Sequence, residues 1–157
     1  MLIENRSINR KHFLFVIPYE THDAKYFSLR IQSYYEGMLN AMKEDGVFKS
    51  NIDRVSIIIT KVDRIQDKEN VYPVANNYLQ KSWSSFYHNL EYICKVYDIN
   101  SGFISTIPFS CGESCLQDFV KIDLSYSEKL IRNLILNQIP SEPPKGRLFK
   151  FIHTFLK

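Results

Sequence analysis

Residues 55–63 read Val-Ser-Ile-Ile-Ile-Thr-Lys-Val-Asp. Residues 55–60 are β-branched or small and nearly all apolar, which is typical of a strand that is buried in a sheet. Polar residues follow at once, so we expect the strand to end at Thr60 and a loop to occupy residues 61–70. Two further apolar runs, at residues 12–18 and 103–109, have the same character. The chain is therefore predicted to contain three strands of this kind.

Apolar side chains at helical spacing fill the intervals between these runs. Residues 24–44 show this spacing, and Asp45-Gly46 then offers a residue that takes the left-handed helix cap at little cost. A second helix is expected from Pro73, which suits the first position of a helix, to about Tyr97. Strands that alternate with helices predict an α/β fold with a short parallel sheet of about three strands and flanking helices.

The C-terminal third is less regular. We expect residues 110–124 to form a loop with at most a short helix. Ser125 and Glu128 have the spacing of a capping box in front of an apolar helix at residues 130–136. The predicted organisation is a polar N-terminal segment at residues 1–11, an α/β half-domain at 12–139, and a proline-containing linker with a basic amphipathic tail at 140–157.

Composition narrows the class of protein. The chain has 157 residues, of which 45% are hydrophobic and 24% charged, as in an ordinary globular domain. A net charge of +3 is too small to predict nucleic-acid binding. Residues 1–11 do not resemble a signal peptide. Cys94, Cys111 and Cys115 form no disulfide framework, and no histidine or second cysteine pair lies near the last two. We therefore expect a reduced, cytoplasmic setting and no zinc site.

Ligands of parallel sheets bind at the carboxyl ends of the strands, so the loops at residues 19–23, 61–70 and 110–116 matter most. Two of them carry a recognisable pattern. One strand ends in Thr60-Lys61-Val62-Asp63, and the next ends in Ser110-Cys111-Gly112. A buried strand followed by [N/T]-K-x-D, then a helix, then a strand followed by S-[A/C]-x resembles the guanine-specificity elements of P-loop GTPases.

The resemblance implies a role for each of these residues. Asp63 would accept two hydrogen bonds from the guanine N1–H and exocyclic amine, a pair of donors that adenine lacks. Lys61 would lay its aliphatic stem over the base. The main-chain N–H of Cys111 would face the guanine carbonyl oxygen, with Ser110 bracing a loop that continues into Gly112. Thr60 stands where many members of the family have asparagine, whose amide ties the loop to its neighbours.

The resemblance covers residues 13–139 and only the base-recognition half of the family's domain. Neither the phosphate-binding G-x-x-x-x-G-K-[S/T] nor the magnesium-associated D-x-x-G is present, and none of the five glycines makes a phosphate loop. The resemblance therefore implies at most weak binding of GTP or GDP through the base. It assigns no catalytic residue and no metal ligand, and we expect no GTP hydrolysis by this chain alone.

The absence of the family's phosphate-binding half also predicts an open sheet edge, because the strand at residues 12–18 would otherwise pair with the phosphate-loop strand. Self-association, a second polypeptide that completes the sheet, or a longer parent protein would each explain this edge. Three functions stay open: a GTPase-derived interaction module without catalysis, an active GTPase completed by another chain, and an unrelated α/β adaptor. The tail at residues 147–157 suits docking on the domain or on an anionic membrane surface.

Overall fold

The computed structural model describes residues 11–19, 25–49, 52–115 and 119–136. Its central sheet has three parallel strands in the order β1–β2–β3. The strands are β1 (Lys11–Pro18), β2 (Ile52–Thr60) and β3 (Ser105–Pro108). In the register of the sheet, Phe15 lies beside Ile57, and Ile58 lies beside Ile107. The predicted α/β class with a short parallel sheet and flanking helices is confirmed.

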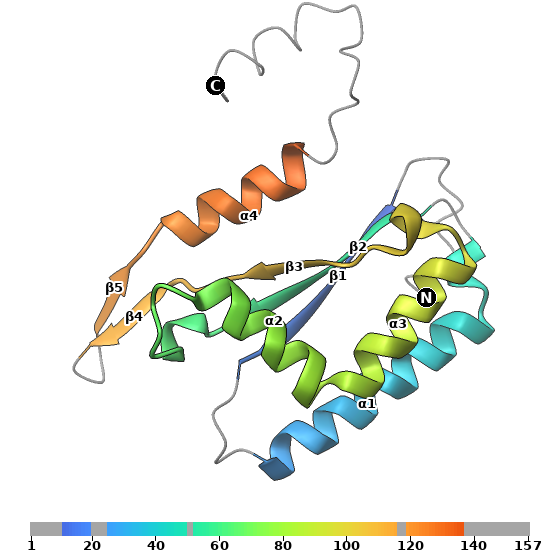
Figure 1. Ribbon diagram of the computed structural model, residues 1–157, viewed down its shortest axis with the longest axis horizontal. Coiled ribbons are helices and arrows are strands. Elements are labelled where there is room, and N and C mark those ends of the chain that lie inside the picture. The colour runs from blue at the N-terminus through green and yellow to red at the C-terminus, as the bar shows by residue number, and fades with distance from the viewer. Residues whose placement is uncertain (1–10, 20–24, 50–51, 116–118, 137–157) are drawn as a thin grey trace, which may run out of the picture.

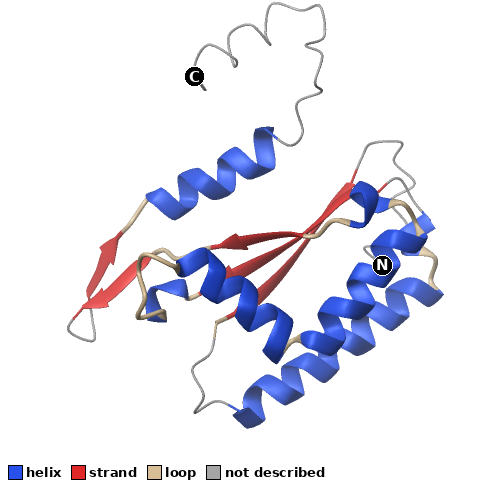
Figure 2. Ribbon diagram, in the orientation of Figure 1, coloured by secondary structure: helices blue, strands red, loops and turns tan. Residues whose placement is uncertain are grey.

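Three helices pack on one face of this sheet (Figures 1 and 2). They are α1 (Lys25–Glu44) between β1 and β2, and α2 (Val71–Ser82) and α3 (Ser84–Val96) between β2 and β3. Two crossovers of the same hand that step in the same direction put their helices on the same face. The last helix, α4 (Ser125–Leu136), lies on the other side of the sheet, over β3.

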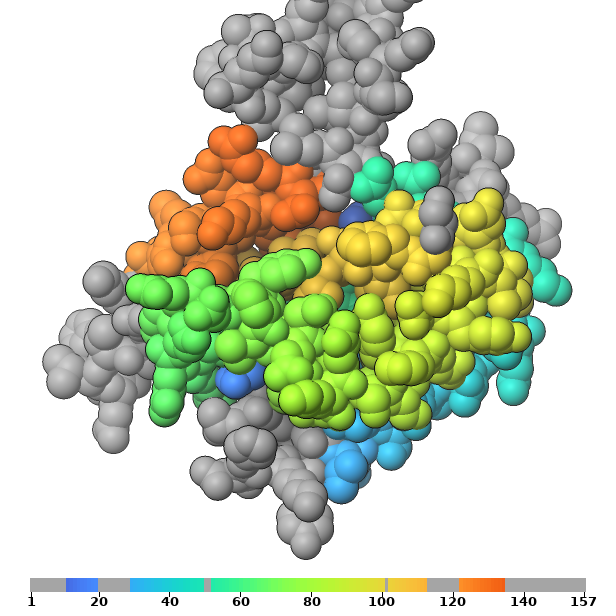
Figure 3. Space-filling view, viewed as in Figure 1, coloured from blue at the N-terminus to red at the C-terminus, as the bar shows by residue number. Residues whose placement is uncertain are grey.

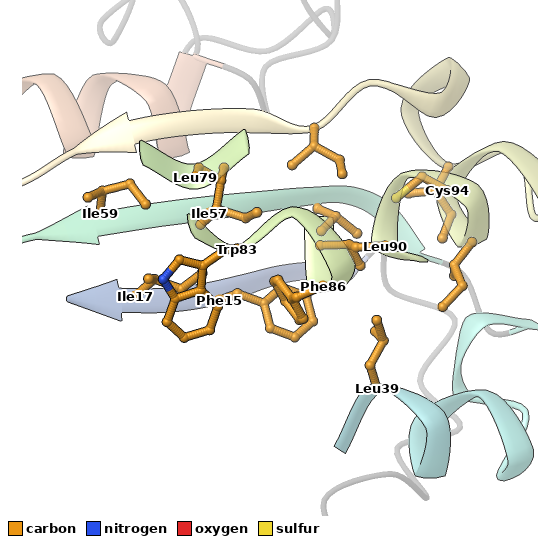
Figure 4. Close-up of a cluster of buried hydrophobic side chains, with 14 of the residues drawn as sticks. Phe15, Ile17, Leu39, Ile57, Ile59, Leu79, Trp83, Phe86, Leu90 and Cys94 are labelled. Atoms are coloured by element: carbon orange, nitrogen blue, oxygen red, sulfur yellow. The ribbon is translucent and has the colours of Figure 1, made fainter. Parts of the chain in front are cut away.

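The core lies between the sheet and these three helices (Figure 4). Val55, Ile57 and Ile59 alternate along β2 and have no exposed surface, which places them on the helix-covered face. The ring of Phe15 meets that of Phe86 edge to face, with centroids 5.3 Å apart. Such aromatic pairs add specific geometry to the area that they bury, so β1 and α3 are fixed relative to each other.

The helix predicted from Pro73 to Tyr97 is wrong in detail. It begins at Val71 and is interrupted at Trp83, which ends α2 and precedes α3. Trp83 is almost fully buried, and its indole N–H donates to the Tyr78 hydroxyl at 3.2 Å. At the interruption, the Ser82 carbonyl accepts a hydrogen bond of 2.7 Å from the Gln32 side chain. Tertiary packing therefore bends a segment whose apolar pattern is continuous.

The loop predicted at residues 110–124 is also corrected. Its backbone forms an antiparallel hairpin of β4 (Gly112–Cys115) and β5 (Phe119–Ile122). The following helix begins at Ser125, earlier than expected, and Ser125 lies in its first turn instead of capping it. The cap comes from Asp123, whose Oδ1 accepts the Ser125 N–H at 2.9 Å.

The predicted polar N-terminal segment lies outside the described residues except for Lys11, which opens β1. The proline-containing linker and the amphipathic tail at 147–157 lie outside them altogether. Of the helices in the described part of the chain, none combines the length and the apolar composition needed to cross a bilayer.

Candidate functional site

The loop after β2 is held rigidly by two buried side chains. Val62 and Ile65 have at most 2% of their surface exposed and anchor the loop in the core. Between β2 and this anchor, Lys61 takes the left-handed conformation with φ of 60°, which is uncommon for a residue other than glycine. The turn directs Lys61 into solvent and leaves Asp63 half-buried at the end of the sheet.

The loop after β3 meets the loop after β2 through one side chain. The Ser110 hydroxyl lies 2.8 Å from Asp63 Oδ1 and 3.1 Å from the Gly112 N–H. The Gly112 carbonyl oxygen lies 3.0 Å from the same hydroxyl, but a hydroxyl has one proton, so it donates to the closer, charged carboxylate and accepts from the amide. Ser110 is 3% exposed and Asp63 is half-buried, so the serine side of this link is buried and the carboxylate side borders solvent. It orients the carboxylate of Asp63 and shapes the turn into β4.

A third group completes the framework around Asp63. Lys68 donates from Nζ to the Asp63 carbonyl oxygen at 2.6 Å. Further along the loop, Asp67 accepts from both the main-chain and the side-chain nitrogen of Asn70, at 3.1 and 2.9 Å. The loop is therefore closed by its own polar side chains before α2 begins, and the Lys68 ammonium group is fixed at the main chain of Asp63.

An open cavity of about 700 Å³ lies over this framework at the carboxyl end of the sheet. One wall is polar and comes from the two loops, and the other is largely apolar and comes from β5 and the start of α4. Ile122 and Leu124 are more than 70% exposed there. The lining residues are Asp63, Lys68, Ser110, Gly112, Ile122, Asp123, Leu124 and Tyr126.

The structure brings together three of the six residues named from the sequence. Asp63, Ser110 and Gly112 line the cavity. Thr60 and Lys61 lie just outside it, and the Thr60 carbonyl is bound by the Tyr19 N–H at 2.8 Å. Cys111 is exposed at the rim, and its carbonyl accepts the Asp123 N–H at 3.2 Å.

Sequence reasoning missed the second wall. Ile122 and Leu124 belong to the stretch that was expected to be a loop, and Tyr126 follows it directly, so nothing indicated that this part of the chain would return to the strand ends. The short apolar-polar-apolar alternation of Val-Lys-Ile at residues 120–122 is a weak signal that favours a strand there. Lys68 carried no such signal, since a lysine in a polar loop is ordinary.

A second cavity of about 380 Å³ continues beside the first and shares Lys68 and Tyr126 with it. It lies along the backbone of β3, and Figure 3 shows α4 and the start of α2 on its two sides. Tyr72 and Lys129 also line it. The combined hollow is large enough for a ligand of nucleotide size.

The described residues offer little for other chemistry. They contain no group of three or more His, Cys, Asp or Glu side chains that could hold a metal ion. Asp63 and Asp123 supply the two carboxylates that line the first cavity. A comparison of the chain with protein-family models, curated proteins and solved structures finds no match.

Proposed function

We propose that this chain is a guanine-recognition module of GTPase-like ancestry, which binds the base weakly and does not hydrolyse GTP by itself. The observation that carries the proposal is the contact between Ser110 Oγ and Asp63 Oδ1 at 2.8 Å. It joins the ends of two neighbouring parallel strands, β2 and β3. These are the two loops whose sequences resemble the family's guanine-specificity elements.

The carboxylate is available to a ligand. Oδ1 is held by Ser110, and Oδ2 makes no hydrogen bond within the described residues. The backbone of Asp63 is anchored by buried Val62 and Ile65, so the carboxylate need not be ordered again on binding. Preorganisation of this kind lowers the entropic cost of association. Two charge-assisted hydrogen bonds to the guanine N1–H and amine would then distinguish guanine from adenine.

The surroundings suit a planar base. Lys61 in its left-handed turn is free to lay its stem against one side of a ring, and Ile122 and Leu124 supply an apolar wall. The Cys111 N–H makes no hydrogen bond to any described residue, so it can donate to the guanine carbonyl oxygen. The sequence contains no G-x-x-x-x-G-K-[S/T] loop, so the base contacts carry the binding energy and the phosphates contribute little.

Calorimetry with GMP, AMP, XMP and GTP tests this proposal. We expect GMP to bind with Kd on the order of 0.1–1 mM, AMP to bind at least about tenfold more weakly, and GTP to bind no more than about threefold more tightly than GMP. Asp63→Asn should weaken GMP and favour XMP, because the amide donates to the additional xanthine carbonyl. Asp123→Asn removes the same charge from the same cavity and is the matched control.

Two calorimetric results would reject the proposal, and two further results would each favour one of its alternatives. One is equal affinity for GMP and AMP, and another is an equal loss in the Asp63 and Asp123 variants. Turnover of magnesium-GTP by the chain alone, abolished by Asp63→Ala, would instead favour an active GTPase. No guanine binding at all would leave an α/β adaptor of unrelated origin.

A further inference from the structure

A third cavity lies at the amino end of β3, away from the guanine site. Its volume is about 320 Å³, and it meets the second cavity at Ser105 and Asn133. It shares no lining residue with the first cavity. Its polar lining residues are Arg54, Ser56, Asn100, Ser105 and Asn133. Of the described residues that line it, Arg54 alone carries a charge.

Strand alternation puts polar side chains on the floor of this cavity. Val55 and Ile57 face the core on the helix-covered side of the sheet, so Arg54 and Ser56 face the opposite side, where α4 lies. Ser105 lies beside Ser56 in the register of the sheet. A sheet face that packs under a helix is normally apolar, so a guanidinium and two hydroxyl groups at this place are unusual.

The charge of Arg54 is only loosely paired. Its side chain is 29% exposed, and Oδ2 of Asp53 lies 3.7 Å from its Nε, which is beyond hydrogen-bond distance. The terminal nitrogens of the guanidinium form no hydrogen bond to a described residue. Largely buried charges are normally paired closely. Arg54 therefore keeps a fork of donors that matches an anion with two or more oxygens.

Further donors surround the cavity. The Ser105 hydroxyl forms no hydrogen bond within the described part of the chain. The side-chain nitrogens of Asn100 and Asn133 each donate one N–H to a main-chain carbonyl, at 3.1 and 3.0 Å, and each keeps a second N–H. These residues belong to β3, to the short helical turn at Ile99–Gly102 and to α4. Donors from several sides suit a tetrahedral anion better than a flat carboxylate.

We propose that this cavity binds a small phosphate ester, with its phosphate group on Arg54 and Ser105. Two N–H groups of the guanidinium donate to two phosphate oxygens, and the hydroxyl donates to the third. Phe103, which is 64% exposed and lines the cavity, contacts the carbon part of the ester. A volume of about 320 Å³ is at the lower end for small-molecule sites, so the ester carries few atoms beyond its phosphate. The inference does not rest on guanine binding, so either proposal can fail alone.

An amide ¹H–¹⁵N titration of the full chain with glycerol 3-phosphate tests the site. We expect shifts at residues 54–56 and 100–105, with Kd on the order of 1 mM. Inorganic phosphate should bind less tightly, because it cannot use the contact with Phe103. Acetate should bind more weakly still. Acetate that binds as tightly as the ester, or an absence of shifts at these residues, overturns the proposal.

Two variants locate the phosphate group. Arg54→Gln should weaken the ester at least about tenfold, because hydrogen bonds to a charged group are lost. Arg30→Gln is the matched control, since it removes the same charge from an exposed residue of α1. Ser105→Ala should weaken the ester and keep the urea midpoint of the wild type, because its hydroxyl holds no described residue. Unchanged affinity in both cavity variants, or an equal loss in Arg30→Gln, overturns the proposal.

The imidazole of His12 gives an independent signal. Its Nε2 lies 2.8 Å from the Ser56 hydroxyl, and its pKa is lowered by burial and by the charge of Arg54, against a smaller opposite effect of Asp53. An anion on Arg54 offsets that charge, so the pKa of His12 should rise when the site is occupied. Sulfate is the probe, because it has the shape of phosphate and keeps its charge throughout a histidine titration. An unchanged pKa of His12 in saturating sulfate overturns the placement of the anion at Arg54.

Discussion

Replacing Ser110 with alanine should destabilise the fold and weaken guanine binding together. The hydroxyl holds Asp63 Oδ1 at 2.8 Å and the Gly112 N–H at 3.1 Å, and its residue is 3% exposed. Ser110→Ala removes both contacts without adding volume. It leaves a carboxylate oxygen and an amide without their partner, at the point where the loops after β2 and β3 meet.

The structure sets the size of the effect. A hydrogen bond to a charged group contributes about 1.5–3 kcal/mol and a neutral one about 0.5–1.5 kcal/mol. Asp63 is half-buried beside an open cavity, so water can replace part of the lost interaction. We therefore expect a loss of about 1–3 kcal/mol in the free energy of unfolding. GMP affinity should fall about three- to tenfold, because the carboxylate must be ordered anew on binding.

Urea denaturation of the wild type, Ser110→Ala, Asp63→Asn and the double variant measures this coupling directly. Ser33→Ala is the control, because the Ser33 hydroxyl binds the Leu29 carbonyl within an exposed helix turn. We expect that control to change stability by less than about 0.5 kcal/mol. A Ser110→Ala variant as stable as the control, with no coupling to Asp63, would refute the reasoning.

Two further predictions concern titratable groups. Burial, aided by the positive charge of Arg54, lowers the pKa of His12 below its ordinary value of 6.5. The unfolded chain therefore binds more protons than the folded chain near this pH. The stability that is present above pH 6.5 should be lost as the pH falls through the lowered pKa. His12→Gln should flatten this acid limb in urea titrations, and an unchanged limb would contradict the assignment. Burial raises the pKa of the Cys94 thiol to about 11, so iodoacetamide should modify exposed Cys111 in the native protein and Cys94 only after unfolding. Mass spectrometry of the labelled peptides checks this order, and early labelling of Cys94 would show that the core opens at α3.

The sequence predicts the sheet well because burial and β-propensity agree there. Residues 12–18 and 55–60 are apolar runs of strand length, and β1 and β2 occupy them with small extensions. The interruption at Trp83 was not predictable from the pattern. Apolar residues continue across it at helical spacing, and no glycine or proline marks it. The break depends on contacts from outside the segment, such as the hydrogen bond from Gln32 to the Ser82 carbonyl.

Part of the candidate site, like part of the fold, could be predicted from the sequence, and part could not. Asp63 and Ser110 were found from sequence because each follows a buried strand directly, and parallel strands bring their carboxyl ends to one edge. The wall from Ile122 to Tyr126 was missed because it depends on the β4–β5 hairpin, whose strands are four residues long. Strands that short give too little alternation to be distinguished from loop. The cap by Asp123 was likewise hidden by the capping-box spacing of Ser125 and Glu128.

The most direct measurement of guanine recognition is an amide ¹H–¹⁵N titration of the full chain with GMP and with AMP. The account predicts that GMP shifts the amides of residues 61–63 and 110–112, that AMP at the same concentration does not, and that Asp63→Asn abolishes the GMP response while Asp123→Asn keeps it. Equal shifts with both nucleotides, or GMP-induced shifts confined to residues away from these two loops, would contradict the central claim.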